Sequence, residues 1–537
     1  PIGELLAEVE AEFDHRHPAA SVPKLLRAYR MMEALPDGYW KRVKMAETQT
    51  VIEACLGLFL EAAADDRAAV PGDSVALTIE AINRSSVDVQ LQRLTLLPQE
   101  KDTLPKQRLA DNERLRFDYK IRLPEELPYT TPYWLRAPHG VGMYTVKEQR
   151  LRGLPEAPPA LQARFELLVE GYPLVYTKAV VFKETDPVAG EVYRPFNIIP
   201  AVTANIAEKV YIFGDDKPQT VEVVVRAGRA GVRGKVSLYP PAGWTVEPDQ
   251  ARFDLELEGQ TKTVQFQVAP PSGASVAELD VVVQREDGRT FDQQLTVIDY
   301  DHIPAQTVLS DAKAKVVKLD LRKAGDRVAY IMGAGDEVPR SLEQIGYEVT
   351  LLEERDVTAG HLQKFDALIL GIRAYNTVDW LKYKQAELLE YVENGGTMIV
   401  QYNTSFRLVL PEEELAPYPL KLSRNRVTVE QAEMKFLKPE HPVLSFPNEI
   451  TQRDFEGWVQ ERGLYFPNEW DKDHFTPIFS AHDPGEAPLK GSLLVAPYGE
   501  GHYVYTGLSF FRELPAGVPG AFRLLANLIS IGKEDRP

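Results

Sequence analysis

The spacing of apolar residues changes twice along this chain of 537 residues. Up to about residue 64, apolar residues recur at intervals of three and four. From there to about residue 305 they alternate with polar ones, and beyond it short apolar runs alternate with helical stretches. These periods belong to amphipathic helices, half-buried strands and β-α units. The sequence therefore predicts a multidomain protein with a helical N-terminal segment, all-β sandwiches and a C-terminal α/β domain.

Residues 1–64 are the predicted helical segment. The helical spacing is carried by ELLAEVEAEF, VPKLLRAYRMMEAL and AETQTVIEACLGLFLEAAA, and the turn Pro36-Asp37-Gly38 separates the last two. Cys55, the one cysteine of the sequence, lies in the third stretch. A single cysteine excludes both a disulfide framework and a cysteine-based zinc site.

Residues 65–305 carry the period-2 pattern of half-buried strands. Stretches such as SVALTIEAINRSSVDVQLQRLTLL, with proline-rich turns between them, predict one or two sandwich modules over residues 65–190. A further immunoglobulin-like sandwich is predicted over residues 191–305, with strands that include TVEVVVRAG, KTVQFQVAPP and AELDVVVQRE. Trp244 is interpreted as a core residue of this module rather than a ligand-stacking one.

Residues 306–537 are predicted to form an α/β domain with a parallel sheet. The apolar runs DRVAYIM, YEVTLL, FDALIL and TMIVQY are separated by the helical stretches VPRSLEQIG and DWLKYKQAELLEYVENGG. In an open parallel sheet, ligands bind outside the carboxyl ends of the strands. Side chains that directly follow these runs are therefore the first candidates for a site.

Polar residues gather after two of these predicted strands. LGIRAYN supplies Arg373, Tyr375 and Asn376, and VQYN supplies Gln401 and Asn403. These groups form hydrogen bonds, but they include no cysteine and no Gly-x-Ser-x-Gly segment that would mark a nucleophile. Two interpretations stay open: Arg373 and its neighbours bind a carboxylate or a sugar, or they form a buried network that fixes the loops.

The segment DFEGWVQERGLYFPNEWD, residues 454–471, mixes aromatic rings with carboxylates. This composition is typical of sugar-binding sites and also of well-packed loops. Its ligand-binding candidates are Asp454, Trp458, Glu461 and Arg462. Asp454 and Glu461 are also the pair that would supply acid and base in a hydrolase. His502, in a later predicted hairpin, is a further candidate.

Several classes of ligand are excluded by charge and spacing. The net charge of −18 opposes binding of nucleic acid and of anionic membranes. No run of 18 apolar residues is present, so no membrane span is predicted. Gly333-Ala334-Gly335 follows a strand, but Val338 stands where a dinucleotide motif needs its third glycine. His15 and His17, two positions apart on a helix, point away from each other and do not share a metal.

Long segments of the sequence resemble one family. They include YRPFNIIP, KVYIFGDDKP, DYDHIP, GAGDEVPRSLEQIGYEV, GIRAYN, GGTMIVQYNT, APYPLKLSRNRVT and SFFRELPAGVPGAFRLLANLISIGKE. Over essentially its whole length the chain is similar to the long bacterial PIG-L (LmbE-like) de-N-acetylases. Residues 205–300 also resemble the β-sandwich module that accompanies some α-galactosidases. The last domain resembles flavodoxin-like domains of the class I glutamine amidotransferase and ThuA types.

The resemblance implies chemistry whose residues this sequence lacks. Family members carry a zinc deacetylase domain with a His-Pro-Asp-Asp segment, in which zinc activates water and an Asp acts as base. No such segment occurs here, since His17-Pro18 precedes Ala19 and His441-Pro442 precedes Val443. An amidotransferase needs a cysteine where Gln401–Asn403 stand. We therefore expect no catalytic residue, no metal site and no cofactor in this chain, and zinc only in a deacetylase domain outside it.

Together these features predict the non-catalytic C-terminal region of a PIG-L-type de-N-acetylase. Its expected partners are its own N-terminal deacetylase domain and a glycan-like, N-acetylated amino-sugar substrate that it binds or positions. Alternatively, the α/β domain is itself a cysteine-independent hydrolase at Arg373–Asn376, Asn403 and Asp454, or the chain is a purely structural oligomerisation module. By analogy with other glycan-handling proteins, the expected location is the periplasm or outside the cell.

Overall fold

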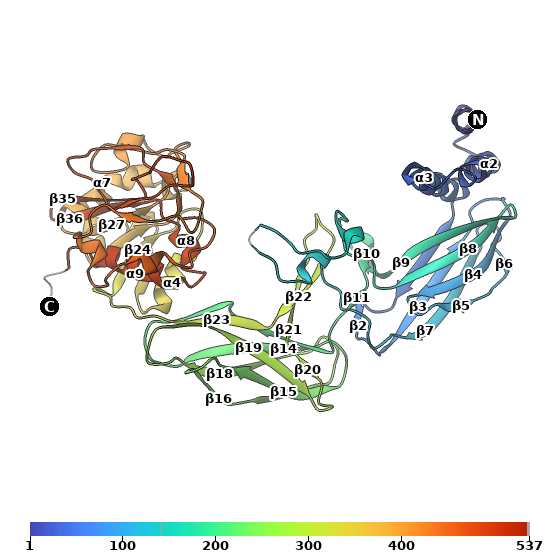
Figure 1. Cartoon of the computed structure of the whole chain (residues 1–537), viewed down its shortest axis with the longest axis horizontal. Helices are drawn as coiled ribbons and strands as arrows, with labels where there is room; N and C mark the ends of the chain where they lie inside the picture. Colours follow the sequence, from blue (N-terminus) through green and yellow to red (C-terminus); the bar gives the residue numbers. More distant parts are fainter. Residues whose placement is uncertain (141, 534–537) are drawn as a thin grey trace.

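The computed structural model describes residues 1–140 and 142–533 and shows a multidomain protein rich in β-sheet, with a helical N-terminus (Figure 1). Its buried apolar side chains fall into separate clusters. One cluster joins the N-terminal helices to the first β-region, a second fills the next β-region, and two more lie in the C-terminal domain. Within the described residues, no helix is long and apolar enough to cross a membrane.

The N-terminal helices pack on the first β-region. They are α1 (Ile2–Ala11), α2 (Val22–Glu33) and α3 (Tyr39–Leu56). Leu25, Leu26 and Ile52 are buried in the same cluster as the strand residues. Gly57 ends α3 in the left-handed conformation, with φ of 56°, which a glycine adopts without steric cost. The first strand follows immediately, so the sheet begins before residue 65.

The first β-region is one sheet folded about a long strand. The first half of β9 pairs with β8 and its second half with β1 and β10, so the two halves of the sheet face each other across one core. In β8 every second residue is buried, as the period-2 pattern predicted. The strands are β1 (Phe59–Ala64), β3 (Ser74–Ile82), β4 (Val89–Leu97), β5 (Lys101–Thr103), β6 (Gln107–Arg108), β7 (Arg114–Arg122), β8 (Gln162–Val169), β9 (Tyr172–Asp186) and β10 (Gly190–Pro195).

The second β-region is a two-sheet sandwich. One sheet has the order β12-β14-β18-β16 and the other β13-β23-β19-β15-β17, with β20 beside β19. Trp244 lies in its core, only 4% exposed, and its ring meets that of Phe213 edge-on at 4.9 Å, which confirms the core interpretation. The strands are β12 (Val202–Ile206), β13 (Val210–Phe213), β14 (Gln219–Ala227), β15 (Val232–Tyr239), β16 (Thr245–Glu247), β17 (Ala251–Leu255), β18 (Thr261–Ala269), β19 (Ser275–Arg285), β20 (Thr290–Phe291) and β23 (Lys313–Lys318).

Two small sheets lie beside this sandwich, and its last strand reaches the C-terminal domain. The small sheets pair β2 (Ala68–Ala69) with β11 (Asn197–Ile198), and β21 (Gln293–Ile298) with β22 (Gln306–Asp311). On β23, Lys315 donates from Nζ to the carbonyl oxygen of Ala516 at 2.7 Å. Arg340 and Glu208 add an ion pair between the same two domains.

The C-terminal domain contains a sheet with the order β25-β24-β26-β27-β36-β35-β33. The first five strands are parallel, and the last two run antiparallel to their neighbours. These strands are β24 (Arg327–Ile331), β25 (Glu348–Leu351), β26 (Ala367–Leu370), β27 (Thr397–Gln401), β33 (Thr476–Pro477), β35 (Leu493–Tyr498) and β36 (Gly501–Thr506). Its helices are α4 (Val338–Gln344), α5 (Ala359–Leu362), α6 (Ala374–Thr377), α7 (Leu381–Glu393), α8 (Phe510–Glu513) and α9 (Pro519–Ser530).

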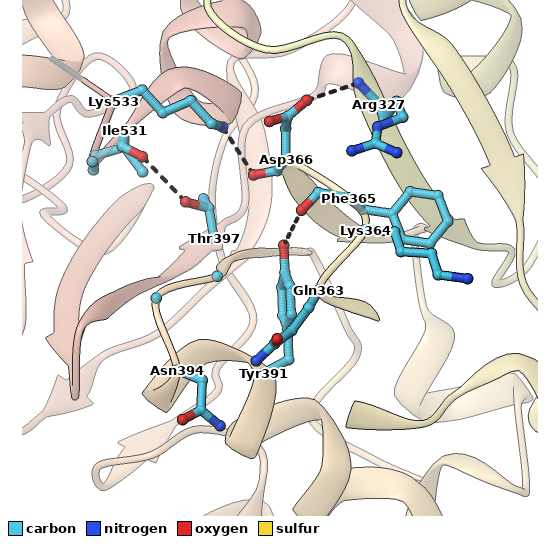
Figure 2. A pocket seen from close by; sticks show the side chains of 13 residues that line it. Arg327, Gln363, Lys364, Phe365, Asp366, Tyr391, Asn394, Thr397, Ile531 and Lys533 are labelled. Carbon is cyan, nitrogen blue, oxygen red and sulfur yellow. Dashed lines mark hydrogen bonds between the residues drawn. The ribbon is translucent and has the colours of Figure 1, made fainter. Parts of the chain in front are cut away.

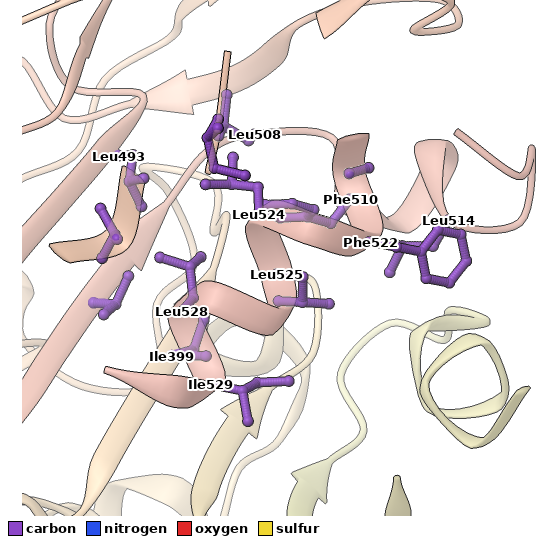
Figure 3. Close-up of a cluster of buried hydrophobic side chains, with 14 of the residues drawn as sticks. Ile399, Leu493, Leu508, Phe510, Leu514, Phe522, Leu524, Leu525, Leu528 and Ile529 are labelled. Carbon is purple, nitrogen blue, oxygen red and sulfur yellow. The ribbon is translucent and has the colours of Figure 1, made fainter. Parts of the chain in front are cut away.

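Both faces of this sheet are covered. Ile399 of β27 packs in one cluster with Leu528 of α9 (Figure 3), whereas Val400 packs in the other with Leu388 of α7. Burial on both sides explains why the parallel strands read as continuous apolar runs. Between β27 and β35 the chain forms three short antiparallel pairs, β28 (Leu420–Lys421) with β32 (Glu469–Trp470), β29 (Asn425–Val427) with β31 (Gly463–Phe466), and β30 (Lys435–Phe436) with β34 (Phe479–Ser480).

Candidate functional site

The carboxyl ends of β26 and β27 bring together the five polar residues expected there. The backbone N–H of Arg373 donates to the carbonyl oxygen of Tyr402 at 2.8 Å, so the two strand ends are bonded to each other. We call Arg373, Tyr375, Asn376, Gln401 and Asn403 the polar floor.

Most of the polar floor is bonded to the loops that carry it. Asn403 is 1% exposed, and its Oδ1 accepts from the N–H of Tyr375 at 2.9 Å while its Nδ2 donates to the carbonyl of Gln401 at 2.9 Å. Asn376 donates to the carbonyl oxygens of Thr404 and Phe406 and accepts from the N–H of Thr404. These amide groups have little capacity left for a ligand, which favours the buried-network interpretation.

Gln401 belongs to a second buried chain of hydrogen bonds. Its Nε2 donates to the Tyr330 hydroxyl at 2.8 Å, and that hydroxyl donates to the Asp336 carboxylate at 2.7 Å. Asp336 also accepts from the N–H groups of Val338 and Ile372. Burial raises the pKa of both Asp336 and Tyr330. The carboxylate thus occupies the start of α4, the place where a dinucleotide motif would hold its phosphates.

Arg373 is the member of the polar floor with the most free capacity. Its backbone is left-handed, with φ of 58°, a conformation that costs a non-glycine residue energy and is enriched at functional positions. Its buried Nε has no hydrogen-bond partner within residues 1–140 and 142–533, and the same holds for Oε1 of Gln401. Arg373 is half-buried, whereas Gln401 and Asn403 are almost fully buried, so it is the floor residue best able to contact a ligand.

A group of three aromatic rings, of which Tyr402 is buried and the other two are half-buried, lies next to Arg373. The ring of Tyr402 stacks on that of Tyr465 at 5.9 Å and 9° and meets Phe511 at 5.4 Å. Burial raises the pKa of Tyr402, and the positive charge of Arg373 opposes that rise. Glu461, a predicted candidate, accepts from Nε of Arg512 at 2.9 Å beside these rings. Glu461 and the polar floor therefore belong to one region.

Asp454, Trp458 and Arg462 lie in packed positions instead. The Asp454 carboxylate accepts from Nε of Arg523 at 2.8 Å and from the N–H of Thr451 at 2.7 Å, which joins the turn at residues 452–455 to α9. Trp458 is 4% exposed and donates to the carbonyl of Asp454. Arg462, also 4% exposed, donates to two backbone carbonyls, and burial lowers its pKa to about 10. All three stabilise the core of the domain.

His502 lies at the opposite end of the parallel strands, where the strands begin. In the pairing of β27 with β36, His502 is opposite Thr397 and Thr506 is opposite Gln401. Four residues of strand, roughly 13 Å, therefore separate His502 from the polar floor. A hollow of about 290 Å³ lies at that end of the strands. In it, Lys533, Tyr391 and Thr397 donate to backbone carbonyls (Figure 2).

A hollow of about 490 Å³ lies where β28 pairs with β32, and we call it the acidic hollow. Trp470, Leu420 and Pro419 supply its apolar wall, and its charged residues are four acids and one lysine: Glu412, Glu413, Glu469, Asp471 and Lys421. The sequence of residues 454–471 predicted a site of aromatic rings beside carboxylates. The four candidates predicted from it lie outside the acidic hollow: Asp454, Trp458, Glu461 and Arg462. The run Glu469-Trp470-Asp471 at the end of that segment was the signal that could have identified the hollow.

The carboxylates of the acidic hollow differ in the hydrogen bonds and ion pairs that they form with the protein. Asp471 accepts from Nδ1 of His474 at 3.0 Å, and this hydrogen bond lowers the Asp471 pKa. Glu469 pairs with Lys421 at 3.2 Å. Glu413 is exposed and forms no hydrogen bond or ion pair in the part of the chain that the structure describes. The hollow therefore combines an apolar wall with carboxylate acceptors that retain capacity for a ligand.

No group of three or more His, Cys, Asp or Glu side chains within residues 1–140 and 142–533 is arranged to hold a metal ion.

Comparison with known families identifies one module. Residues 213–284 match the family described as NPCBM-associated, NEW3 domain of alpha-galactosidase. These residues make up most of the second β-region, and the match supports the predicted resemblance to a galactosidase-associated sandwich. A search of curated proteins finds no match.

Comparison with solved structures shows only remote likeness. Salmonella alpha-2-macroglobulin reacted with methylamine is 10% identical over 50% of this chain and 16% of its own, with a TM-score of 0.18. A protein of unknown function from Porphyromonas gingivalis is 11% identical over 49% of this chain and 98% of its own, at a TM-score of 0.13. A domain structure of Intimin is 7% identical over 48% and 97%, at 0.15. This chain thus spans a small part of the macroglobulin, and no functional argument rests on these similarities.

Proposed function

We propose that this chain is a non-catalytic, glycan-binding region of a carbohydrate-active protein and that the acidic hollow holds the sugar. The observation that carries the proposal is the position of Trp470, half-buried in the wall of a hollow with four carboxylates. The family match of residues 213–284 supports a carbohydrate context for the chain.

The chemistry of the acidic hollow suits an amino sugar. An indole ring packs against the apolar face of a pyranose, and carboxylates accept hydrogen bonds from hydroxyl and ammonium groups. Four carboxylates against one lysine ammonium make the hollow negative. An N-acetylated sugar is neutral, whereas the same sugar without its acetyl group is a cation. We therefore expect the hollow to bind the de-N-acetylated form more tightly.

This preference agrees with the accessory role inferred from the sequence. In a PIG-L-type de-N-acetylase, a zinc domain outside this chain would remove the acetyl group, and this chain would retain and position the partly deacetylated glycan. The order β25-β24-β26-β27-β36 supports a flavodoxin-like domain of the glutamine amidotransferase type, with Gln401–Asn403 at the nucleophile position. A glycan substrate also favours a location in the periplasm or outside the cell.

Binding of defined sugars tests the proposal. Glucosamine hexamer and N-acetylglucosamine hexamer are titrated into the whole chain by isothermal calorimetry. We expect the glucosamine hexamer to bind more tightly, and Trp470→Ala to weaken that binding about tenfold, or 1.4 kcal/mol. Trp40→Ala, a change at a 69% exposed tryptophan of the helical segment, is the matched control and leaves the affinity unchanged.

Two results would contradict the proposal. In the first, the Trp470→Ala protein binds the glucosamine hexamer as tightly as the unchanged protein does. In the second, the chain binds neither sugar and forms a stable oligomer, which is the behaviour of a structural module.

A further inference from the structure

The second sandwich carries a hollow of opposite charge. About 660 Å³ in volume, it lies against β15, β17 and β19. Five cationic side chains and two acidic ones line it: Arg233, Lys235, Arg252, Lys262, Arg285, Asp254 and Glu286. We call it the cationic hollow. A concentration of positive charge is unexpected in a chain whose net charge is −18.

Two of its cations face each other without a counter-ion. Lys235 of β15 is directly opposite Arg252 of β17 in the antiparallel register. Like charges in this position repel and destabilise the strand pair. Within residues 1–140 and 142–533, neither the Lys235 ammonium nor the Arg252 guanidinium forms an ion pair or donates a hydrogen bond to the protein.

The other cations are already engaged. Nε of Arg233 donates to the Asp254 carboxylate at 2.9 Å, and Arg285 pairs with Asp287 at 3.2 Å. Nζ of Lys262 donates to the carbonyl oxygen of Arg252 at 2.9 Å. A carbonyl does not neutralise an ammonium group, so the positive charge without a carboxylate partner lies on Lys262 and on the Lys235–Arg252 pair.

The backbone beside this pair is closely packed. Gly234, between Arg233 and Lys235, carries no side chain, and a Cβ there would lie 2.2 Å from the carbonyl oxygen of Gln284. The strands β15 and β19 thus approach closely at this point, and Phe253 below them is buried in the sandwich core. Because Phe253 points into the core, its neighbour Arg252 and the opposite residue Lys235 project from the outer face of the sheet, where the hollow lies.

We propose that the cationic hollow binds an anionic oligosaccharide and that Lys235 and Arg252 together hold one of its carboxylate or sulfate groups. An acidic group between them would turn the like-charge repulsion into two charge-assisted hydrogen bonds. The volume of the hollow falls in the range of sites for small ligands, of about 300–1,000 Å³. The match of this module to an α-galactosidase-associated family favours a sugar, and the charge of the whole chain opposes a long polyphosphate.

This inference does not depend on the proposed function, because it concerns another module and a ligand of opposite charge. Its test uses the whole chain and four probes: a hyaluronan octasaccharide with carboxylates, a heparin octasaccharide with sulfates, neutral N-acetylglucosamine hexamer and single-stranded dT8. Affinity is measured by calorimetry at two salt concentrations. The relative affinity of the two acidic octasaccharides decides between carboxylate and sulfate.

The deciding protein variant is the double change Lys235→Gln and Arg252→Gln. We expect it to weaken binding of the acidic octasaccharide about tenfold or more and to reduce the dependence on salt. The double change Lys209→Gln and Lys217→Gln removes the same charge from exposed positions of the same module and is expected to leave binding unchanged. Thermal unfolding supplies a second readout, since removal of the like-charge pair is expected to leave the module as stable as before or more so.

Three outcomes would overturn the inference. They are no binding of either acidic octasaccharide, equal weakening by both double variants, and tighter binding of dT8 than of the sugars. Trp470→Ala is expected to leave this binding intact, so that failure here and failure of the proposed function are distinguishable.

Discussion

The polar floor and the acidic hollow lie in the same domain, but side chains of the floor are bonded to the protein, whereas side chains of the hollow remain accessible. Asn403 and Gln401 of the floor are 1% and 2% exposed and are bonded to the protein. In the acidic hollow, Trp470 is half-buried and Glu413 is exposed. The end of a parallel strand is a favourable place for a site, but free hydrogen-bonding capacity and an accessible ring are what a ligand requires. By that measure the hollow is the better candidate, and Arg373 is the one floor residue that competes with it.

The largest effect, on the free energy of unfolding, is expected from Glu513, a buried carboxylate of the same domain that contrasts with the exposed Glu413 of the hollow. Glu513 is fully buried, and burial raises its pKa from the ordinary 4.5 to about 8. Between these values the unfolded chain holds fewer protons than the folded one, so the free energy of unfolding falls as pH rises. The slope is up to about 1.4 kcal/mol per pH unit, and the fall ends above pH 8.

Urea unfolding at pH 5, 6.5 and 8 measures this trend. Glu513→Gln keeps an oxygen acceptor for the N–H of Val459 and is expected to flatten the profile between pH 5 and 8. An unchanged slope in the Glu513→Gln protein would show that another group causes the pH dependence.

A substitution in the polar floor tests whether the floor stabilises the fold or binds the sugar. Asn403→Ala leaves the buried N–H of Tyr375 without its acceptor and is expected to lower the free energy of unfolding by about 3 kcal/mol, without changing the affinity for glucosamine hexamer. Asn394→Ala, at an exposed asparagine at the end of α7, is the control, with an expected loss below about 0.5 kcal/mol. Loss of sugar binding in a folded Asn403→Ala protein would assign the floor a direct role.

The smallest effect on sugar binding is expected from the substitution of one carboxylate of the acidic hollow, Glu413. Glu413 forms no hydrogen bond or ion pair within the described residues, so Glu413→Gln removes only charge. We expect it to weaken binding of glucosamine hexamer about two- to fourfold at low salt and less at high salt. Glu440→Gln, at an exposed residue outside the hollow, controls for net charge. Equal effects of the two changes would mean that only the overall charge matters.

The sequence predicted most of the architecture because periodicity reports burial directly. The change from period 3.6 to period 2 located the helices and the sandwiches, and the apolar runs located the parallel strands. The position of Trp244 in a core followed from its place between strands. Element ends were less accurate: β1 begins within the segment expected to be helical, and β23 extends the second sandwich beyond residue 305.

The site was harder to predict because it depends on partners distant in sequence. Strand ends placed Arg373 beside Asn403, but no pattern showed that Tyr375 and Thr404 use up the amides. The acidic hollow arises where Leu420–Lys421 pairs with Glu469–Trp470, almost fifty residues later. His502 is the second residue of β36, and only the parallel register with β27 shows that this end of the strand lies away from the polar floor.

The most direct test compares Trp470→Ala with Arg373→Ala in the same titration of glucosamine hexamer. Trp470 represents the acidic hollow, and Arg373 represents the polar floor through its unpartnered Nε. We predict that Trp470→Ala weakens binding about tenfold, while Arg373→Ala, once shown by circular dichroism to be folded, binds as the unchanged protein does. Loss of affinity in Arg373→Ala with full affinity in Trp470→Ala would contradict the account and place the sugar on the floor.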